Sequence, residues 1–391
     1  MVRELGAAPG LEVTRRCADL AELVAAAAAG LGRVAVVSGG ITGLDRAVVD
    51  QLRSTGTWVV VLPDDAAPER LGQLGADTVT DDVSPAAVVA AVLAVLAGAP
   101  PAPATDVTGD GGGRPVGRLV VVWGPTGAPG RTTVAVTLAT ELAERAAAAE
   151  GSVLLIDADT YGGTVAQVLG MLDEAPGIAA AARAAGTGRL DTARLASLSP
   201  RLGGGLQVLT GISRAARWPE LSAASLDVVW STARAMARWT VVDCGFCLEQ
   251  DEALSYDTRA PARNAATLSA LASADLVVVV GAGDPVGLQR LVRGLSDLDD
   301  LGIGSTSRLV VVNRVRATAC GRRPRSAVRE ALRRFAGVED VLLVPDDGPS
   351  CDAALLAGRS LTEHAPGSPV RQAVADVAER VLSLGAGEGA D

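Results

Sequence analysis

The stretch RLVVVWGPTGAPGRTTVAVTLATELAERAAAA, residues 118–149, decides the fold of the larger part of this 391-residue chain. Residues 118–123 form a continuous run that is nearly all apolar, which is typical of a strand buried on both faces. The loop at 124–133 contains three Gly and two Pro, and a helical pattern follows it. A strand, a Gly-containing loop and a helix that opens with Thr are the context of a phosphate-binding P-loop.

The loop has the residues that phosphate binding requires. Gly127 and Gly130 allow a close approach to the backbone, whose N–H groups act together with the positive end of the helix dipole. Thr132 offers a hydroxyl to Mg²⁺, and Thr133 can reach an inner phosphate. The sequence therefore predicts a site for a di- or triphosphate.

Two substitutions separate this loop from the standard Walker A pattern. Arg131 replaces the Lys, and Pro125 replaces the first Gly. Arg keeps the positive charge but is bulkier and planar. A strand–turn–helix corner rich in Gly and Pro, without a ligand, is the alternative interpretation of the loop alone.

Further apolar runs predict strands within 152–163, 238–245, 275–285, 307–315 and 338–347. Polar residues stand where these strands end, and ligands of parallel α/β sheets bind at that edge. These residues are Asp157, Asp159, Asp243 and Asn313. The fold class expected is α/β, a doubly wound and mostly parallel P-loop NTPase domain.

Composition excludes several classes of function. The net charge of −10 argues against a surface that coats nucleic acid generally, and 2% aromatic residues disfavour base-stacking platforms. The chain contains no Lys, so all 35 cations are Arg, and its single His excludes a His-rich metal site. An odd count of five Cys and the lack of a signal-peptide pattern favour reduced thiols and a cytoplasmic location.

The chain divides at a Pro- and Gly-rich segment, so we predict domains at 1–97 and 118–391 and a flexible linker at 98–117. Strands and helices alternate in the first domain, which predicts a parallel sheet. The strands are expected at 11–17, 33–38, 58–62 and 78–80, and the helices at 18–29, 44–54, 68–74 and 85–96.

This first domain resembles a response-regulator receiver, flavodoxin-like in fold, through VVSGGITGLD at 36–45 and ERLGQLGADTVTDDVSP at 69–85. Ser38 stands where the phosphoacceptor Asp would be, and no Lys follows the turn at 75–77. The resemblance therefore implies a pseudo-receiver that serves as an interaction module. A receiver's first strand and helix are not found ahead of Leu11, so either the start is assigned too late or a partner completes the domain. An unspecified small α/β domain is the alternative.

The second domain resembles the MinD/ParA group of deviant P-loop ATPases, and within it the CpaE/TadZ branch, which includes actinobacterial septum-site-determining and Flp pilus assembly proteins. The segments that carry the resemblance are GPTGAPGRTT, LLIDADTYGG, VVDCGFC and VVVNRV, in that order. That branch joins a pseudo-receiver to the ATPase, so the resemblance covers nearly the whole chain. It implies ATP or ADP and Mg²⁺ as ligands and a homodimer that forms on ATP binding.

The resemblance also implies a role for each matching residue. Asp159 would orient the attacking water and Arg131 would stand in for the catalytic Lys. Metal contacts would come from Thr132, Asp157 and Asp243. Asn313 would read the adenine edge. The nucleotide contacts implied are Gly127, Ala128, Pro129, Gly130, Arg131, Thr132, Thr133, Asn313, Pro345 and Asp346.

The largest departure from the family pattern is Thr126, where the group carries a signature Lys that reaches the partner subunit's phosphates. Hydrolysis is then slow, or another Arg acts across the dimer, with Arg217 and Arg263 as candidates. An ordinary surface position is the alternative for each Arg. The function expected is a spatial regulator that places septum or pilus/secretion machinery, recruited to a pole or septum. A nucleotide-binding scaffold without turnover is one alternative.

Three other features have a functional and a plain interpretation. The CxxC pair Cys244 and Cys247 could hold a metal shared across a dimer or could be packing residues. An Arg-rich stretch from Arg308 to Arg334 could bind DNA, as in a ParA-like partition ATPase, or could be solvated helix charge. The acidic C-terminal tail at 370–391 disfavours a direct membrane anchor.

Overall fold

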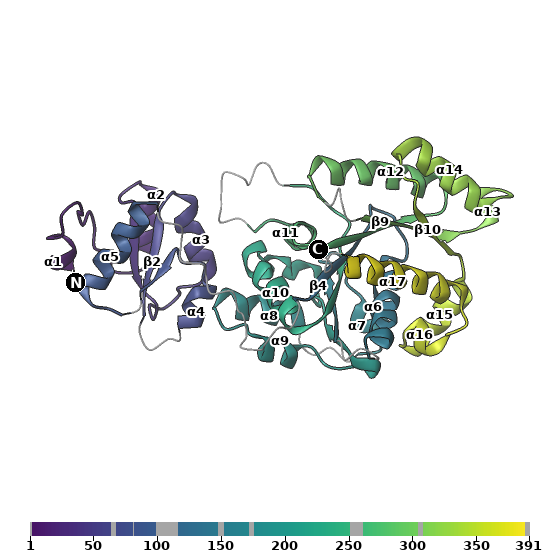
Figure 1. The fold of residues 1–391 in the computed structure, drawn as a ribbon, viewed down its shortest axis with the longest axis horizontal. Coiled ribbons are helices and arrows are strands. Elements are labelled where there is room, and N and C mark those ends of the chain that lie inside the picture. The colour runs from purple at the N-terminus through teal and green to yellow at the C-terminus, as the bar shows by residue number, and fades with distance from the viewer. Residues whose placement is uncertain are drawn as a thin grey trace. The chain divides into compact units, whose positions relative to one another are not determined.

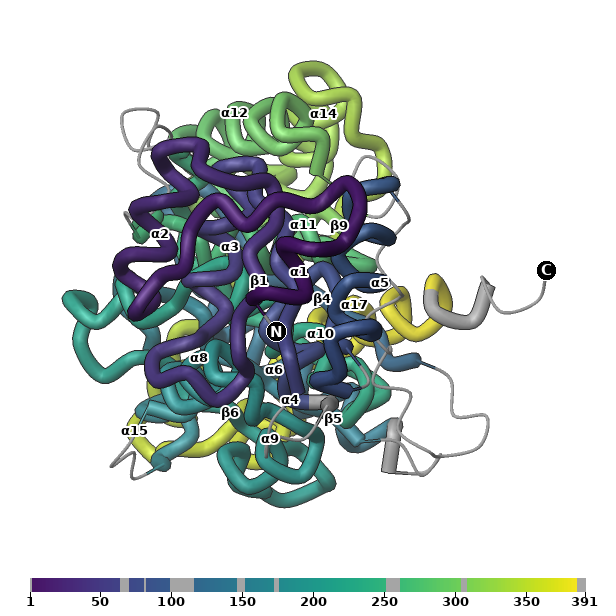
Figure 2. The backbone as a smooth tube through the Cα atoms, turned by 90° about the vertical axis from the view of Figure 1, so that its left-hand side faces the viewer, coloured from purple at the N-terminus to yellow at the C-terminus, as the bar shows by residue number. Residues whose placement is uncertain are grey.

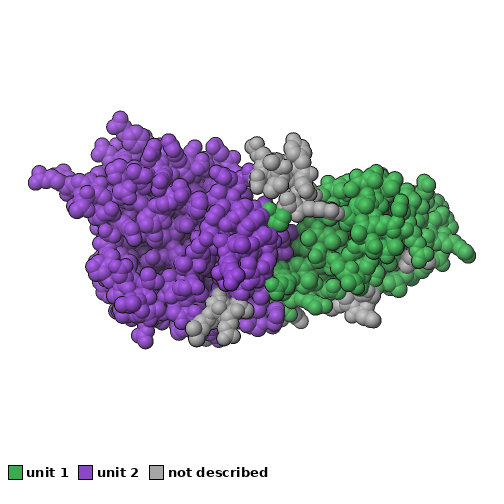
Figure 3. All heavy atoms as spheres, turned by 180° about the vertical axis from the view of Figure 1, so that it is seen from behind, with its two compact units in different colours: residues 1–112, 182–191, 252–261 green, residues 113–181, 192–251, 262–391 purple. Residues whose placement is uncertain are grey.

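The computed structural model describes residues 2–63, 68–80, 82–98, 116–147, 152–171, 176–250, 261–303 and 308–387. The chain falls into two compact units, which are coloured separately in Figure 3. One contains residues 1–112 with 182–191 and 252–261, and the other contains residues 113–181, 192–251 and 262–391. The predicted linker lies almost entirely outside the described residues.

The larger unit is built on a seven-stranded sheet in the order β10-β9-β8-β4-β7-β5-β6 (Figure 1). Every neighbouring pair of its strands runs parallel, which confirms the expected α/β class. The strands are β4 (Arg118–Trp123), β5 (Val153–Ala158), β6 (Leu206–Leu209), β7 (Trp239–Cys244), β8 (Leu276–Ala282), β9 (Arg308–Val315) and β10 (Val341–Pro345). All but β6 match strands predicted from the sequence.

Helices cover both faces of this sheet, as a doubly wound fold requires. Apolar residues of α6 and α17 join one face in a single core cluster, and α10, α11 and α12 contact the strands from outside that cluster. α12 and α14 lie side by side (Figures 1 and 2). The helices are α6 (Arg131–Ala147), α7 (Val165–Val168), α8 (Gly177–Gly186), α9 (Thr192–Leu198), α10 (Ala223–Met236), α11 (Ala265–Ala272), α12 (Pro285–Asp300), α13 (Ala317–Cys320), α14 (Pro324–Ala336), α15 (Gly348–Ala357), α16 (Leu361–His364) and α17 (Pro369–Gly387). Short 3₁₀ turns occupy Gly203–Gly205 and Ala215–Glu220.

The N-terminal unit contains a parallel three-stranded sheet in the order β1-β2-β3. Its strands are β1 (Val34–Ser38), β2 (Trp58–Leu62) and β3 (Thr78–Val79). Its helices are α1 (Val2–Leu5), α2 (Leu20–Ala28), α3 (Arg46–Ser54), α4 (Pro68–Gln73) and α5 (Pro85–Leu96). α1 was not expected, whereas α2 to α5 and the three strands agree with the sequence-based prediction.

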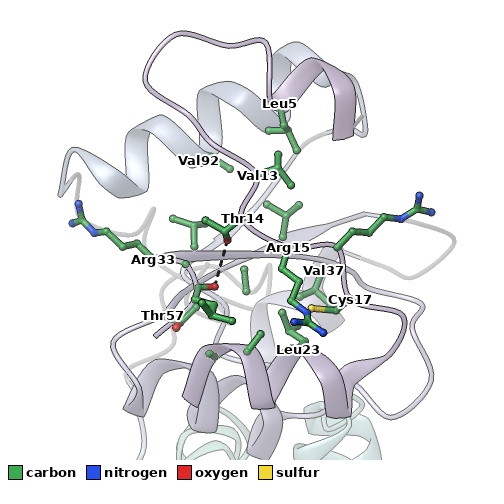
Figure 4. A pocket seen from close by; sticks show the side chains of 18 of the residues that line it. Leu5, Val13, Thr14, Arg15, Cys17, Leu23, Arg33, Val37, Thr57 and Val92 are labelled. Atoms are coloured by element: carbon green, nitrogen blue, oxygen red, sulfur yellow. Dashed lines mark hydrogen bonds between the residues drawn. The ribbon is translucent and has the colours of Figure 1, made fainter. Parts of the chain in front are cut away.

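The strand predicted at 11–17 is wrong, because these residues belong to no sheet. Within the described residues β1 pairs only with β2, and a cavity of about 720 Å³ lies beside β1 (Figure 4). All five β1 residues line the cavity, and residues 10–17 line it too. A strand needs a hydrogen-bonded neighbour. Residues 11–17 line this cavity together with β1 but form no ladder with it, so they do not form a strand.

No helix in the described part of the chain is long and apolar enough to cross a membrane.

Candidate nucleotide-binding site

The P-loop connects β4 to α6, and its backbone requires Gly at two positions. Gly127 has φ +69° and Gly130 has φ +88°, a region that other residues rarely adopt. A Cβ on Gly130 would lie 2.2 Å from Asn313 Nδ2, and a Cβ on Gly124 would lie 2.2 Å from the Val280 carbonyl oxygen. The loop is thus held tightly between the ends of β4, β8 and β9, with its amides at the start of α6.

Thr132 and Asp243 meet as the sequence predicts. Thr132 lies in the first turn of α6, and its Oγ1 donates a 2.6 Å hydrogen bond to Asp243 Oδ2. β7 pairs with β4 in a register that aligns Asp243 with Val122, so the carboxylate lies at the carboxyl edge beside the P-loop. A hydroxyl and a carboxylate in contact beside a phosphate loop fit a magnesium site in which the nucleotide phosphates and water supply the other oxygens.

Asp157 anchors a loop in this structure. It is 1% exposed and aligned with Asp243 across β5 and β7. Its Oδ1 accepts from the Asp159 amide at 3.1 Å, and its Oδ2 accepts from the Val165 amide at 3.1 Å. A Cβ on Gly163 would lie 2.5 Å from this carboxylate. Asp157 therefore lies beside the predicted metal pair but uses both oxygens to shape the turn after β5.

Asp159 and Arg131 contact each other across the site. Asp159 Oδ1 accepts from the amides of Tyr161 and Gly162, at 2.8 and 3.2 Å. Its Oδ2 lies 3.5 Å from Arg131 Nη2. Arg131 Nη1 also donates to the Gly124 carbonyl at 3.3 Å, so this guanidinium spans the loop. Arg131 thus links the turn that holds Asp159 to the P-loop.

The base-binding prediction is met only in part. Asn313 is buried at the end of β9, but its Nδ2 donates to the Pro129 carbonyl at 2.9 Å and so braces the P-loop. Pro345 ends β10, and Asp346 lies 3.8 Å from Arg316. Asn313 and the 345–346 loop thus follow neighbouring strands, as expected.

Burial dominates the electrostatics of the two strand-end carboxylates. Desolvation and the nearby Asp243 charge raise the pKa of Asp157 from 3.8 to about 8. Desolvation also raises the pKa of Asp243 to about 7, against the lowering effects of the Thr132 hydroxyl and Arg131. Near neutral pH the nucleotide-free site therefore holds protons that a bound cation would displace.

We expect the nucleotide-free protein to lose stability as pH rises from about 4 to about 8. Unfolded Asp ionises near 3.9. Above that pH the unfolded chain binds fewer protons than the folded one, so the free energy of unfolding falls until both states are ionised. Urea unfolding with EDTA at pH 5 to 8 checks this. Asp243→Asn should flatten the decline, and equal slopes in both proteins would contradict it.

A network that the sequence analysis missed ties the Asp159 turn to the loop after β7. Arg263 stacks on the Tyr161 ring at 3.8 Å and donates to the Thr160 hydroxyl at 2.7 Å. Tyr161 Oη donates to Asn264 Oδ1 at 2.8 Å, and Asn264 Nδ2 donates to the Glu249 carbonyl. The contacts that Arg263 and Asn264 make with Thr160 and Tyr161 join residues about 100 positions apart, and no local sequence pattern predicts them.

The two arginines considered as candidates to act across a dimer are engaged within their own chain. Arg263 makes the contacts above, and Arg217 makes a two-bond ion pair with Glu220. Arg217 thus lies in a surface ion pair of its own chain, and Arg263 braces the turn that holds Asp159.

Two features from the sequence analysis remain, the CxxC pair and the Arg-rich stretch. Cys244 is buried, and Cys247 Sγ accepts from Asn264 Nδ2 at 3.3 Å. The described residues contain no group of three or more His, Cys, Asp or Glu placed to hold a metal. In the Arg-rich stretch, Arg308 pairs with Asp299, but seven others are exposed: Arg314, Arg322, Arg323, Arg325, Arg329, Arg333 and Arg334.

No protein-family model matches this chain, and no curated protein sequence does. Solved structures do match its fold. A ParA family ATPase from Chlorobium tepidum TLS superposes with TM-score 0.57 at 16% identity, covering 68% of this chain and 99% of that one. The cell division ATPase MinD from Pyrococcus furiosus gives 0.53 at 20% identity, covering 68% and 99%. The septum site-determining protein MinD complexed with Mg-ADP, from Pyrococcus horikoshii OT3, gives 0.53 at 20% identity, covering 69% and 97%. The chain therefore has the parallel α/β P-loop fold that MinD and ParA ATPases share.

Proposed function

We propose that this chain is a Mg²⁺-dependent ATP-binding switch of the MinD/ParA class, which hydrolyses ATP slowly and forms a homodimer when ATP is bound. The observation that carries the proposal is the Thr132–Asp243 contact beside a P-loop whose Gly127 and Gly130 both have positive φ. A hydroxyl bonded to a buried carboxylate has no structural need of a loop with this backbone. The position of this P-loop at the start of α6 suits the binding of phosphate oxygens.

In this proposal Thr132 and Asp243 hold Mg²⁺, which neutralises phosphate charge when bound. The loop residues 127–133 hold the phosphates through their amides. Asp159 orients the attacking water, and Asp157 keeps the Asp159 turn in place through its bond to the Asp159 amide. Arg131, within 3.5 Å of Asp159, releases that carboxylate when phosphate oxygens compete for its guanidinium. Asn313, with residues 345–346, flanks the base.

The finer role is a spatial regulator of the CpaE/TadZ type, which places septum or pilus/secretion machinery from the cytoplasm at a pole or septum. The N-terminal unit would be a receiver-like interaction module followed by a linker. Its three parallel strands, with β1 at the edge, agree with a five-stranded flavodoxin-like receiver sheet that lacks the two strands beside β1.

A second candidate is a ParA-like DNA-partition ATPase. The six exposed arginines on and just before α14 favour it, because phosphate backbones are bound by clustered cations. ATP-dependent retention on DNA that disappears in the triple variant Arg322→Ala, Arg323→Ala, Arg325→Ala supports this candidate, and no retention of the wild type dismisses it.

Mg-ATPase turnover measured against protein concentration tests the proposal. We expect the specific rate to rise with concentration, because a dimer-dependent switch is inactive as a monomer. A rate per molecule that stays constant would remove the dimer from the proposal. Tight ATP binding with no turnover would favour the nucleotide-binding scaffold.

A further inference from the structure

Helix α12 packs closely against the start of the P-loop. It follows β8, and small residues on one face let it approach: a Cβ on Gly287 would lie 2.4 Å from the Ala282 Cβ. One on Gly294 would lie 3.0 Å from the Trp123 ring and 3.2 Å from the Pro125 Cβ. Residues spaced by three and four lie on one helix face, so Arg290 shares this face with Gly287 and Gly294.

The Arg290 side chain reaches Gly127 of the P-loop. A Cβ on Gly127 would lie 2.0 Å from Arg290 Nη1 and 3.2 Å from its Cζ, so the guanidinium lies directly against the Gly127 backbone. Arg290 is exposed, and within the described ranges it has no carboxylate partner. This leaves an uncompensated positive charge touching the loop that is proposed to hold phosphates.

Arg131, the cation within the loop, directs its guanidinium to other groups than Gly127. Arg131 is engaged with the Gly124 carbonyl and Asp159, and Thr126, next to Gly127, is neutral. A polyphosphate placed on the loop would bring several negative charges to the Gly127 side, where Arg290 is the group in contact. A planar guanidinium with free N–H groups suits two phosphate oxygens at once.

We propose that Arg290 binds the terminal phosphates of the nucleotide and makes the site prefer a triphosphate to a diphosphate. The inference rests on the proposed ATP-binding function and adds to it a recognition residue from α12, outside the loop motif. Arg290 needs only to turn its side chain from the Gly127 backbone to an oxygen bound there. It thereby supplies the charge that Thr126 lacks.

Calorimetric titration of Mg-ATP and Mg-ADP into wild type, Arg290→Gln and Arg293→Gln tests the proposal. Arg293 is a matched control, because it is exposed on the same helix but the three atoms nearest a Cβ on Gly127 all belong to Arg290. We expect Arg290→Gln to weaken ATP affinity about 10- to 100-fold, as the loss of a charged hydrogen bond does, and ADP affinity less. Arg293→Gln should stay within about twofold of wild type.

Two further variants separate recognition from packing. Arg290→Lys should recover part of the ATP affinity, and Thr126→Lys added to Arg290→Gln should recover it from the opposite side of Gly127. Thermal unfolding without nucleotide should be unchanged in all variants. Equal affinities of wild type and Arg290→Gln for ATP would overturn the proposal, as would equal losses for ATP and ADP. Wild type that binds neither nucleotide would overturn the proposed function itself, a distinct result.

Discussion

Replacing Asp159 by Ala is expected to lower Mg-ATP turnover at least about 100-fold while leaving ATP affinity within a few-fold of wild type. A positioned carboxylate that handles the proton of an attacking water contributes about 10² to 10⁴ in rate. Asp159 does not contact Thr132 in this structure. Its oxygens are used by the amides of Tyr161 and Gly162 and by Arg131. The substitution therefore removes the group proposed to act in hydrolysis and leaves the proposed magnesium ligands, Thr132 and Asp243, in place.

Single-turnover kinetics with saturating protein separate hydrolysis from binding and product release. Asp297→Ala is the matched control, since Asp297 is an exposed carboxylate on α12, and its rate should equal that of wild type. If Asp159→Ala hydrolyses ATP as fast as this control, the assignment of Asp159 fails, and a scaffold with adventitious turnover becomes the better account.

Replacing Glu141 by Ala is expected to destabilise the larger unit by about 3 kcal/mol, near the low end for breaking a buried ion pair. Glu141 is 0% exposed on α6 and accepts bonds from Arg371 of α17, Arg145 and the Thr362 hydroxyl. Without it both guanidinium groups lose a carboxylate. They are partly exposed, and Arg371 keeps Glu144 at 3.4 Å, so the cost stays near this lower value.

Urea unfolding at pH 7 measures this effect, and Glu144→Ala is its control. Glu144 is on the same helix, is 52% exposed and shares Arg371 as a partner, so its removal should cost no more than about 1 kcal/mol. Equal losses in the two variants would show that the buried position of Glu141 contributes nothing special. A stable Glu141→Ala protein would contradict the network as a tie between α6 and α17.

The sequence predicts most strands of the larger unit because runs such as 118–123 and 276–282 are almost continuously apolar, which is typical of strands buried on both faces. β6 escapes notice because Leu206–Leu209 is only four residues long. The error at 11–17 has the opposite cause. Those residues have strand character, but a strand also depends on a neighbour, which is a property of the tertiary structure.

In the candidate site, too, the sequence predicts what local pattern determines and misses what depends on the tertiary structure. The Thr132–Asp243 contact could be predicted because a P-loop and a strand end on adjacent parallel strands have to meet. Asp157 was predicted in the right place, but its bonds to two amides depend on the turn after β5. The positions of Arg263 and Arg290 follow from helix packing, which brings together residues over 100 positions apart. Local patterns carry no such information.

The most direct test is calorimetric titration of Mg-ATP and Mg-ADP into the full chain, with Thr132→Ala alongside. Our account predicts saturable binding of both nucleotides that weakens when Mg²⁺ is replaced by EDTA. It also predicts that Thr132→Ala loses this magnesium dependence, because Thr132 and Asp243 form the metal pair. No heat of binding for either nucleotide at high micromolar protein, or binding equally tight without Mg²⁺ and in Thr132→Ala, would contradict it.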